Sequence, residues 1–195
     1  MSTFPQGFAQ TQAAIEFAER MHAGQHRGDG SPFILHPLEV ASLLYYAGAA
    51  DYLIAAGVLH DVVEKADVAA AELRERFGPR ITSLVLAVSD DDQIVDYEGR
   101  KAALRRQVAA AGKDALTLFA ADKLSKLREL RRETAADSRD SVTPGRVRKL
   151  RARRLRHYRR SLALLEERIP ESPLVGELRD ELHALVRNRD LAAAR

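Results

Sequence analysis

The stretch VLHDVVEK at residues 58–65 closes a strongly apolar run, YLIAAGVL, that begins at Tyr52. His60 and Asp61 directly follow this run, and Glu64 comes three residues after Asp61 and four after His60. These spacings place all three side chains on one face of a helix. Burying ionisable side chains is costly unless they are paired or bound to a metal ion. The stretch therefore predicts a core helix that carries a compensated polar site.

Composition places the chain among folded globular proteins, with 46% hydrophobic and 30% charged residues in 195 positions. The absence of cysteine excludes disulfides and thiolate metal sites and fits a reducing, cytoplasmic setting. The first residues lack the basic and apolar parts of a secretory signal. No apolar segment reaches the roughly 18 residues that span a bilayer. We expect a cytoplasmic protein that has no membrane partner.

Helical patterns dominate the sequence and strand patterns are nearly absent. Helices are predicted over about 9–24, from His36-Pro37, from Asp51 to Glu64, after Asp67, from Pro79, and over about 98–111, 114–133, 146–169 and 174–188. Asp51 and Asp67 are expected to cap the helices that they begin, and Gly78 to end one. Residues 134–145 are predicted to form a loop. The expected fold is an all-α helical bundle with additional C-terminal helices.

A basic block, RVRKLRARRLRHYRR at residues 146–160, contains nine Arg or Lys residues and no acid. Such a block could bind the phosphates of a nucleotide or a nucleic acid. Its apolar residues, however, recur every three to four positions, as in an amphipathic helix with a solvated basic face. We favour the solvated face, so nucleic acid is a disfavoured partner.

Two further polar residues lie in apolar surroundings and could complete a metal site with His60 and Asp61. His36 stands beside Pro37, which restricts its backbone toward an extended conformation. Asp122 lies within the apolar segment FAADKLSKL at residues 119–127. Nitrogen and oxygen ligands without sulfur suit Mn, Fe, Co, Ni or Zn. Taken singly, His36 could be a cap and Asp122 the partner of an arginine; the metal site depends on their joint occurrence.

At these residues the chain resembles the HD-domain hydrolases of the RelA/SpoT-homologue type, in particular the stand-alone small alarmone hydrolases. The resemblance covers about residues 10–133. It runs through AIEFAERMHAGQHR at 14–27, GSPFILHPLEVA at 30–41, AAGVLHDVVE at 55–64, RFGPRITSLV at 76–85 and FAADKLSKLR at 119–128. It implies a single HD-type domain over residues 1–195, with a core at about 10–133 and a helical extension at about 146–190.

The resemblance also implies an activity, the removal of the 3′-pyrophosphate from guanosine 3′,5′-bispyrophosphate, (p)ppGpp, and it assigns residues to that activity. The metal ligands, position by position, are His36, His60, Asp61 and Asp122, and the usual ion is Mn²⁺. Glu64 matches a catalytic acid, and Arg27 matches the arginine that stacks on the guanine base. His22 matches a position with a structural role.

Three positions depart from the family pattern. The usual Glu-Asp pair is Glu64-Lys65, the usual Arg-Lys pair is Arg27-Gly28, and an Asn becomes Lys126. Lys65 and Lys126 each follow a metal-ligand position by four residues, so we expect both to project to the rim of the metal pocket and to bind phosphate there. We place Lys65 with Glu64 as candidate catalytic residues, and Lys126 with Arg27 as candidate substrate-binding residues. The alternative is that both lysines are exposed and pair with Glu64 or Glu129.

The departures keep other functions open. The same chemistry could act on a different nucleotide, or the fold could serve as a nucleotide sensor that has lost turnover. The acidic loop at Asp90–Asp92 could bind a cation, although a solvated loop is favoured. The expected partner is a small-molecule nucleotide, and the sequence is compatible with a homo-oligomer.

Overall fold

The computed structural model describes residues 7–137 and 145–193. These residues form nine α-helices and no strand, apart from an isolated bridge between His26 and Pro32. The helices are α1 (Ala9–Met21), α2 (Leu35–Tyr46), α3 (Asp51–Leu59), α4 (Val62–Ala66), α5 (Ala70–Val88), α6 (Tyr97–Ala111), α7 (Lys113–Asp137), α8 (Gly145–Arg168) and α9 (Pro173–Ala193). The all-α prediction is confirmed. Among the described residues, no helix is long and apolar enough to cross a membrane.

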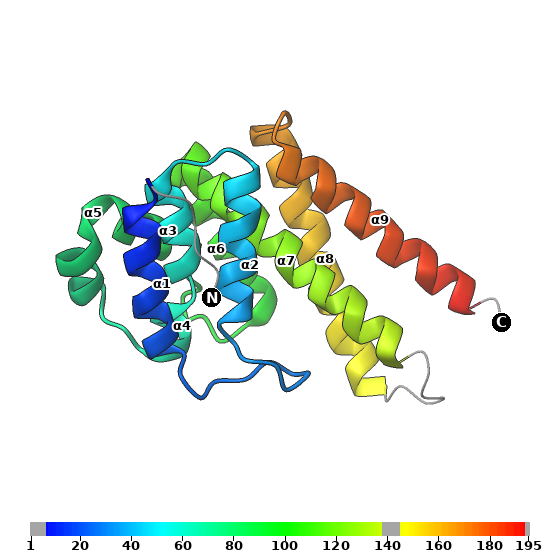
Figure 1. Cartoon of the computed structure of the whole chain (residues 1–195). Coiled ribbons are helices and arrows are strands. Elements are labelled where there is room, and N and C mark those ends of the chain that lie inside the picture. Colours follow the sequence, from blue (N-terminus) through cyan, green and yellow to red (C-terminus); the bar gives the residue numbers. More distant parts are fainter. Residues whose placement is uncertain (1–6, 138–144, 194–195) are drawn as a thin grey trace.

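Helix α7 connects the two parts of the arrangement seen in Figure 1. On one side it contacts α2, α3, α5 and α6, and on the other it contacts α8 and α9, which also pack on each other. Helix α3 is enclosed by α1, α2, α5 and α7. The apolar run from Tyr52 to Leu59 therefore lies at the centre of the bundle.

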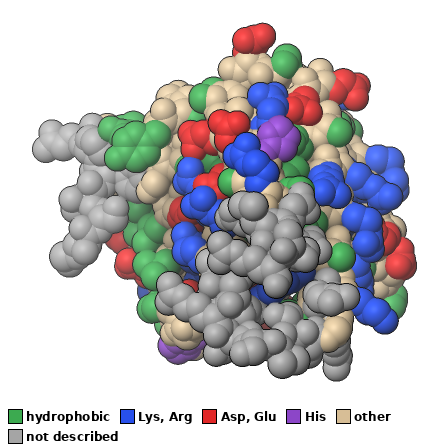
Figure 2. Space-filling model, turned by 90° about the vertical axis from the view of Figure 1, so that its right-hand side faces the viewer, with side chains coloured by type: hydrophobic (Ala, Val, Ile, Leu, Met, Phe, Trp, Pro, Cys, Tyr) green, Lys and Arg blue, Asp and Glu red, His purple; other side chains and the backbone are tan. Residues whose placement is uncertain are grey.

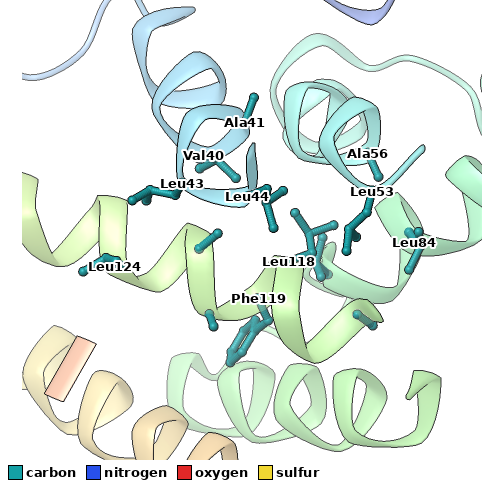
Figure 3. Packing of buried hydrophobic residues seen from close by; sticks show 14 of the residues in the cluster. Val40, Ala41, Leu43, Leu44, Leu53, Ala56, Leu84, Leu118, Phe119 and Leu124 are labelled. Atoms are coloured by element: carbon teal, nitrogen blue, oxygen red, sulfur yellow. The ribbon is translucent and has the colours of Figure 1, made fainter. Parts of the chain in front are cut away.

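Figure 3 shows part of the apolar core, where side chains of α2, α3, α5 and α7 pack on one another. Leu44 of α2 and Leu118 and Phe119 of α7 have no exposed surface. Burying a side chain of this size contributes about 1.5–3 kcal/mol. Most of α7 between residues 115 and 127 is buried, and the polar residues Asp122, Lys123 and Ser125 are buried with it.

Two predicted helix caps are wrong, and one of them reveals a tertiary contact. The Asp51 carboxylate accepts hydrogen bonds from the backbone N–H groups of Gln10 and Thr11, both at 2.9 Å, so it caps α1 rather than its own helix. Asp67 ends α4 in the left-handed conformation, with φ 53°, and does not begin α5. Helix ends depend on what packs against them, which local sequence does not specify.

The predicted helix from Asp51 to Glu64 is interrupted. Helix α3 ends at Leu59 and α4 starts at Val62, with His60 and Asp61 at the junction.

The first helix ends at Met21, three residues earlier than predicted, and α2 includes His36, so this residue is helical rather than extended. Gly78 does break α5, with φ 78° and ψ 169°, as predicted. Helix α7 continues through part of the predicted loop to Asp137, and residues 138–144 lie outside the described part.

Candidate metal centre

Four buried side chains from three separate segments converge at one point. His36 lies in the first turn of α2, His60 and Asp61 at the α3–α4 junction, and Asp122 in the middle of α7; each is only 2–3% exposed. The two histidine Nε2 atoms are 3.1 Å apart. Asp61 Oδ2 lies 3.5 and 3.4 Å from the Nε2 atoms of His36 and His60, and Asp122 Oδ1 lies 3.3 and 3.5 Å from them.

The interruption between α3 and α4 explains how two consecutive residues face the same point. Neighbouring side chains on a continuous helix project about 100° apart. Asp61 lies at the edge of the right-handed helical region, with φ −99° and ψ −2°, and its carboxylate lies beside the His60 ring. The continuous helix that we expected would have placed Glu64 on this face as well. Glu64 is instead exposed to solvent.

Hydrogen bonds to the Nδ1 atoms orient both imidazole rings. His60 Nδ1 donates to the carbonyl oxygen of Gly57 at 2.7 Å. The Ser125 hydroxyl donates to Glu39 Oε2 at 3.0 Å, so its oxygen accepts from His36 Nδ1 at 2.9 Å. Partners of this kind fix the tautomer of metal-binding histidines. Each neutral ring is left with an Nε2 lone pair directed into the cluster.

The donor set fits a divalent metal ion. Two lone pairs facing each other at 3.1 Å repel unless a cation lies between them, and Asp61 Oδ2 has no hydrogen-bond partner among the described residues. Donors bound at about 2.1 Å to one ion lie about 3.0–3.4 Å apart, close to the separations seen here. The cluster His36, His60 and Asp122 offers ligand atoms that all lie within 4.8 Å of one another. Two nitrogens and two carboxylate oxygens suit a first-row divalent ion.

Two lysines contact the carboxylates of this cluster. Lys123 Nζ lies 2.5 Å from Asp122 Oδ2 and 4.5 Å from the Phe119 ring centroid, and its side chain is 4% exposed. Lys126 Nζ lies 2.8 Å from Asp122 Oδ1 and 3.8 Å from Asp61 Oδ1, with 32% of its side chain exposed. Lys126 thus contacts the candidate ligands directly instead of pairing with Glu64 or Glu129.

The charges of the cluster shift the pKa values of its members in opposite directions. Burial would raise the pKa of Asp122, but the ammonium groups of Lys123 and Lys126 outweigh it and hold this pKa well below its usual range. Burial lowers the pKa of His36. Burial acts on His60 in the same direction, but the Asp61 carboxylate reverses the effect, so the pKa of His60 is raised.

The two candidate catalytic residues, Glu64 and Lys65, are both exposed and lie outside the group of converging donors. Glu64 Oε1 accepts a hydrogen bond from the backbone N–H of Asp90 at 2.5 Å. The Lys65 side chain forms no ion pair with a described residue. The Asp90 side chain pairs with Lys101, so the prediction of a solvated acidic loop holds for its two exposed neighbours and is wrong for Asp90.

Arg27 and His22 lie close to the cluster, in the segment that follows α1. Arg27 Nε donates to Glu129 Oε1 at 3.0 Å, and the arginine side chain is 7% exposed. His22 is buried against Phe33, and its Nδ1 lies 2.9 Å from Gln25 Oε1. Burial lowers the pKa of His22, and its ring is not one of the converging donors.

The basic block lies in α8, and several of its arginines contact side chains of other helices, although Arg156 and Arg160 remain exposed. Arg153 stacks 4.2 Å from the ring centroid of Tyr97, and Arg154 pairs with Glu133 at 3.0 Å. Arg156 and Arg160 both reach Glu98 at 3.2 Å. The side chains of residues 146 and 148 lie outside the described part. On the face shown in Figure 2, Lys and Arg side chains gather on the right, and toward the top and left they are interspersed with Asp and Glu.

Sequence reasoning missed three residues that support the donors. Lys123 holds Asp122, while Ser125 and Glu39 form the chain that orients His36. Lys123 and Ser125 stand among apolar positions of α7, and that placement was the available signal that they must be buried and paired. Glu39 follows His36 by three residues, the spacing at which side chains of one helix can share a partner.

A family comparison matches the HD domain over residues 14–144. A GTP pyrophosphokinase of Streptomyces coelicolor is 38% identical over 125 residues, 63% of this chain and 15% of that protein. A guanosine-3′,5′-bis(diphosphate) 3′-pyrophosphohydrolase of Aquifex aeolicus is 34% identical over 132 residues, 67% of this chain and 19% of that protein. The chain thus spans less than a fifth of the length of these two bacterial relatives.

A shorter relative matches over most of its length. The human guanosine-3′,5′-bis(diphosphate) 3′-pyrophosphohydrolase MESH1 is 38% identical over 130 residues, which are 65% of this chain and 72% of that protein. A metazoan orthologue of SpoT, described as hydrolysing ppGpp, shares the fold at a TM-score of 0.72 and 23% identity, over 96% of this chain and 98% of that one. The family match covers more than half of the sequence, and the four converging His and Asp side chains lie within it. The chain belongs to the HD-domain family.

Proposed function

We propose that this protein is a cytoplasmic, Mn²⁺-dependent phosphohydrolase that removes the 3′-pyrophosphate from (p)ppGpp. The observation that carries the proposal is the convergence of the two histidine Nε2 atoms, 3.1 Å apart, with one oxygen of Asp61 and one of Asp122, each 3.3–3.5 Å from both nitrogens. The names of the Aquifex and human relatives support the choice of substrate.

His36, His60, Asp61 and Asp122 would hold the metal ion. A divalent ion in this position supplies Lewis acidity, which lowers the pKa of water and polarises a phosphoryl oxygen. Ser125 and the Gly57 carbonyl keep both rings in the ligating tautomer. Lys123 neutralises the Asp122 oxygen that faces away from the histidines.

Glu64, Lys65, Arg27 and Lys126 would act on the substrate. Glu64 is exposed at the start of α4, held by the Asp90 amide, and can accept a proton from the attacking water or deliver one to the leaving oxygen. Lys65, exposed and without an ion pair to a described residue, can offset phosphate charge. Arg27, positioned by Glu129, presents a guanidinium plane that suits a purine base. Lys126 would also contact the substrate.

The same site favours a second candidate, an HD phosphohydrolase for another nucleotide or a nucleotide sensor with impaired turnover. The observation behind it is that the ammonium group of Lys126, at a position that departs from the family pattern, contacts the carboxylates of Asp61 and Asp122 directly. Such a charge distribution changes which phosphate arrangement the site accepts.

A direct assay distinguishes these functions. The purified full-length chain is incubated with ppGpp and Mn²⁺, and the products are separated by anion exchange, with GDP and pyrophosphate expected. A panel of other 3′-phosphorylated purine nucleotides, tested in parallel, identifies the second candidate if one of them is hydrolysed faster. Tight ppGpp binding without phosphate or pyrophosphate release would identify the sensor.

A further inference from the structure

Lys126 places a positive charge on the oxygen atom that a metal ion would use. Its Nζ lies 2.8 Å from Asp122 Oδ1, and this same oxygen faces the Nε2 atoms of His36 and His60. The ammonium group also lies 3.8 Å from Asp61 Oδ1. An ammonium at this position competes directly with any cation for both carboxylates.

The cluster is electrically balanced before a metal ion arrives. Two carboxylates, Asp61 and Asp122, face two ammonium groups, Lys123 and Lys126, and ligating imidazoles are neutral. A divalent ion would bring two further positive charges into a buried position. Like charges a few ångströms apart in such surroundings strongly disfavour each other. Withdrawal of one of the two ammonium groups would relieve this repulsion when a metal binds.

The structure distinguishes the lysine that can move from the one that cannot. Lys123 is 4% exposed, contacts the outer oxygen of Asp122 and lies over the Phe119 ring. Lys126 is 32% exposed and contacts the inner oxygen through a flexible four-carbon side chain. Only Lys126 combines contact with the ligand oxygen and a route to solvent.

We propose that Lys126 is a built-in competitor of the metal ion, whose ammonium group holds the donor carboxylates in the metal-free protein and leaves them when a divalent cation binds. The inference rests on the metal site assigned under the proposed function. Its consequence is that this chain binds divalent metal more weakly than its donor set allows. The displaced ammonium is then free for an anionic phosphoryl group.

Metal affinity tests the proposal without reference to catalysis. Free Mn²⁺ is followed by its electron paramagnetic resonance signal during titration of the full-length wild type and of Lys126→Gln. The variant is expected to bind Mn²⁺ at least tenfold more tightly, about 1.4 kcal/mol. Lys65→Gln is the matched control, because it removes the same charge from a nearby exposed position without an ion pair to the ligands. It should change the affinity less than threefold.

Chemical labelling of the wild type gives a second readout that needs no variant. An acetylating reagent is applied with and without Mn²⁺, and modification of each lysine is measured by peptide mass spectrometry. Acetylation of Lys126 should rise at least fivefold on metal binding, while that of exposed Lys65 stays constant and serves as the internal reference.

The outcomes separate this inference from the metal site itself. If wild type and Lys126→Gln bind Mn²⁺ with equal affinity, or the variant binds more weakly, the competition is refuted and the metal site stands. Unchanged Lys126 labelling at saturating Mn²⁺ refutes it as well. If neither protein binds Mn²⁺, both the site and the competition are wrong.

Discussion

The two histidines His60 and His157 are equally buried, but their surroundings shift their pKa values in opposite directions. Both side chains are 3% exposed. Burial lowers the pKa of each ring, but the Asp61 and Asp122 carboxylates reverse this effect at His60 and raise its pKa. At His157 the charges of Lys123 and Lys101 add to burial, and its pKa falls to about 2. The His157 ring is therefore neutral at any physiological pH.

The difference shows that the sign of the neighbouring charges decides whether a buried histidine can bind a metal cation. His157 Nδ1 accepts a hydrogen bond from Arg105 at 2.9 Å, and its Nε2 has no hydrogen-bond partner among the described residues. A metal ion at this ring would meet the charges of Lys123, Lys101 and Arg105, which together outweigh that of Asp122. Lys123 lies between the two regions, because it pairs with Asp122 and also lowers the pKa of His157.

The largest effect is expected from Asp61→Asn, which removes one charge from the donor cluster at constant shape. Turnover should fall at least about a thousandfold, because metal assistance contributes several kcal/mol to phosphoryl transfer. Affinity for Mn²⁺, measured by calorimetry, should fall at least about a hundredfold, since even indirect support of a ligand is worth 10–100-fold. His157→Phe is the control and should keep both quantities within threefold. Equal losses in the two variants would mean that the surroundings of His60 and of His157 do not differ in their importance for metal binding.

Removing Lys123 should have the next largest effect, this time on stability. Lys123→Met leaves the outer oxygen of Asp122 buried without its cation, and breaking a buried pair in this way costs about 3–5 kcal/mol. Urea denaturation of the metal-free protein measures the loss. Added Mn²⁺ should recover part of the lost free energy of unfolding in the variant, because the ion supplies the missing positive charge. A loss below about 1 kcal/mol would show that Lys123 is incidental.

The third prediction concerns pH. His157 in the unfolded chain takes up a proton near pH 6.5, whereas the folded protein does so only near pH 2, so stability falls as the pH drops below about 6.5. This residue alone should remove about 2 kcal/mol between pH 6.5 and 5, at about 1.4 kcal/mol per pH unit. The free energy of unfolding of His157→Phe should decline less steeply by that amount. Parallel slopes for the two proteins would contradict the low pKa.

The smallest effect is expected from the surface of α8. Arg156→Gln and Arg160→Gln each break one exposed contact with Glu98, and such pairs contribute about 0–1 kcal/mol. Neither variant should change Mn²⁺ affinity. A loss of ppGpp hydrolysis in either one, at unchanged stability, would assign α8 a role in binding the substrate.

The periodicity of apolar residues in the sequence was sufficient to predict most of the helices and the apolar centre of the bundle. Alternation of apolar and polar residues is a local signal, and α6 through α9 follow it within a few residues. The junction at His60 and the capping of α1 by Asp51 were not predictable, because both depend on contacts between segments far apart in the sequence.

For the candidate site, the sequence identified the four converging side chains, and the resemblance joined them into one group. It did not identify the environment that sets their chemistry. The Ser125–Glu39 chain, the position of Lys126 on the carboxylates and the exposure of Glu64 arise from side-chain packing between helices. Spacing along the chain contains no information about these distances.

The cap that Asp51 provides for α1 has a consequence for the dynamics of the protein. The amides of Gln10 and Thr11 donate to a carboxylate that begins α3, the helix whose other end adjoins His60. Their protons exchange with solvent once the Asp51 carboxylate releases them, as it does when the start of α1 separates from α3. The rate of deuterium uptake at these two amides thus reports how often α1 opens from α3. It does so at the end of α3 that lies away from the donor cluster.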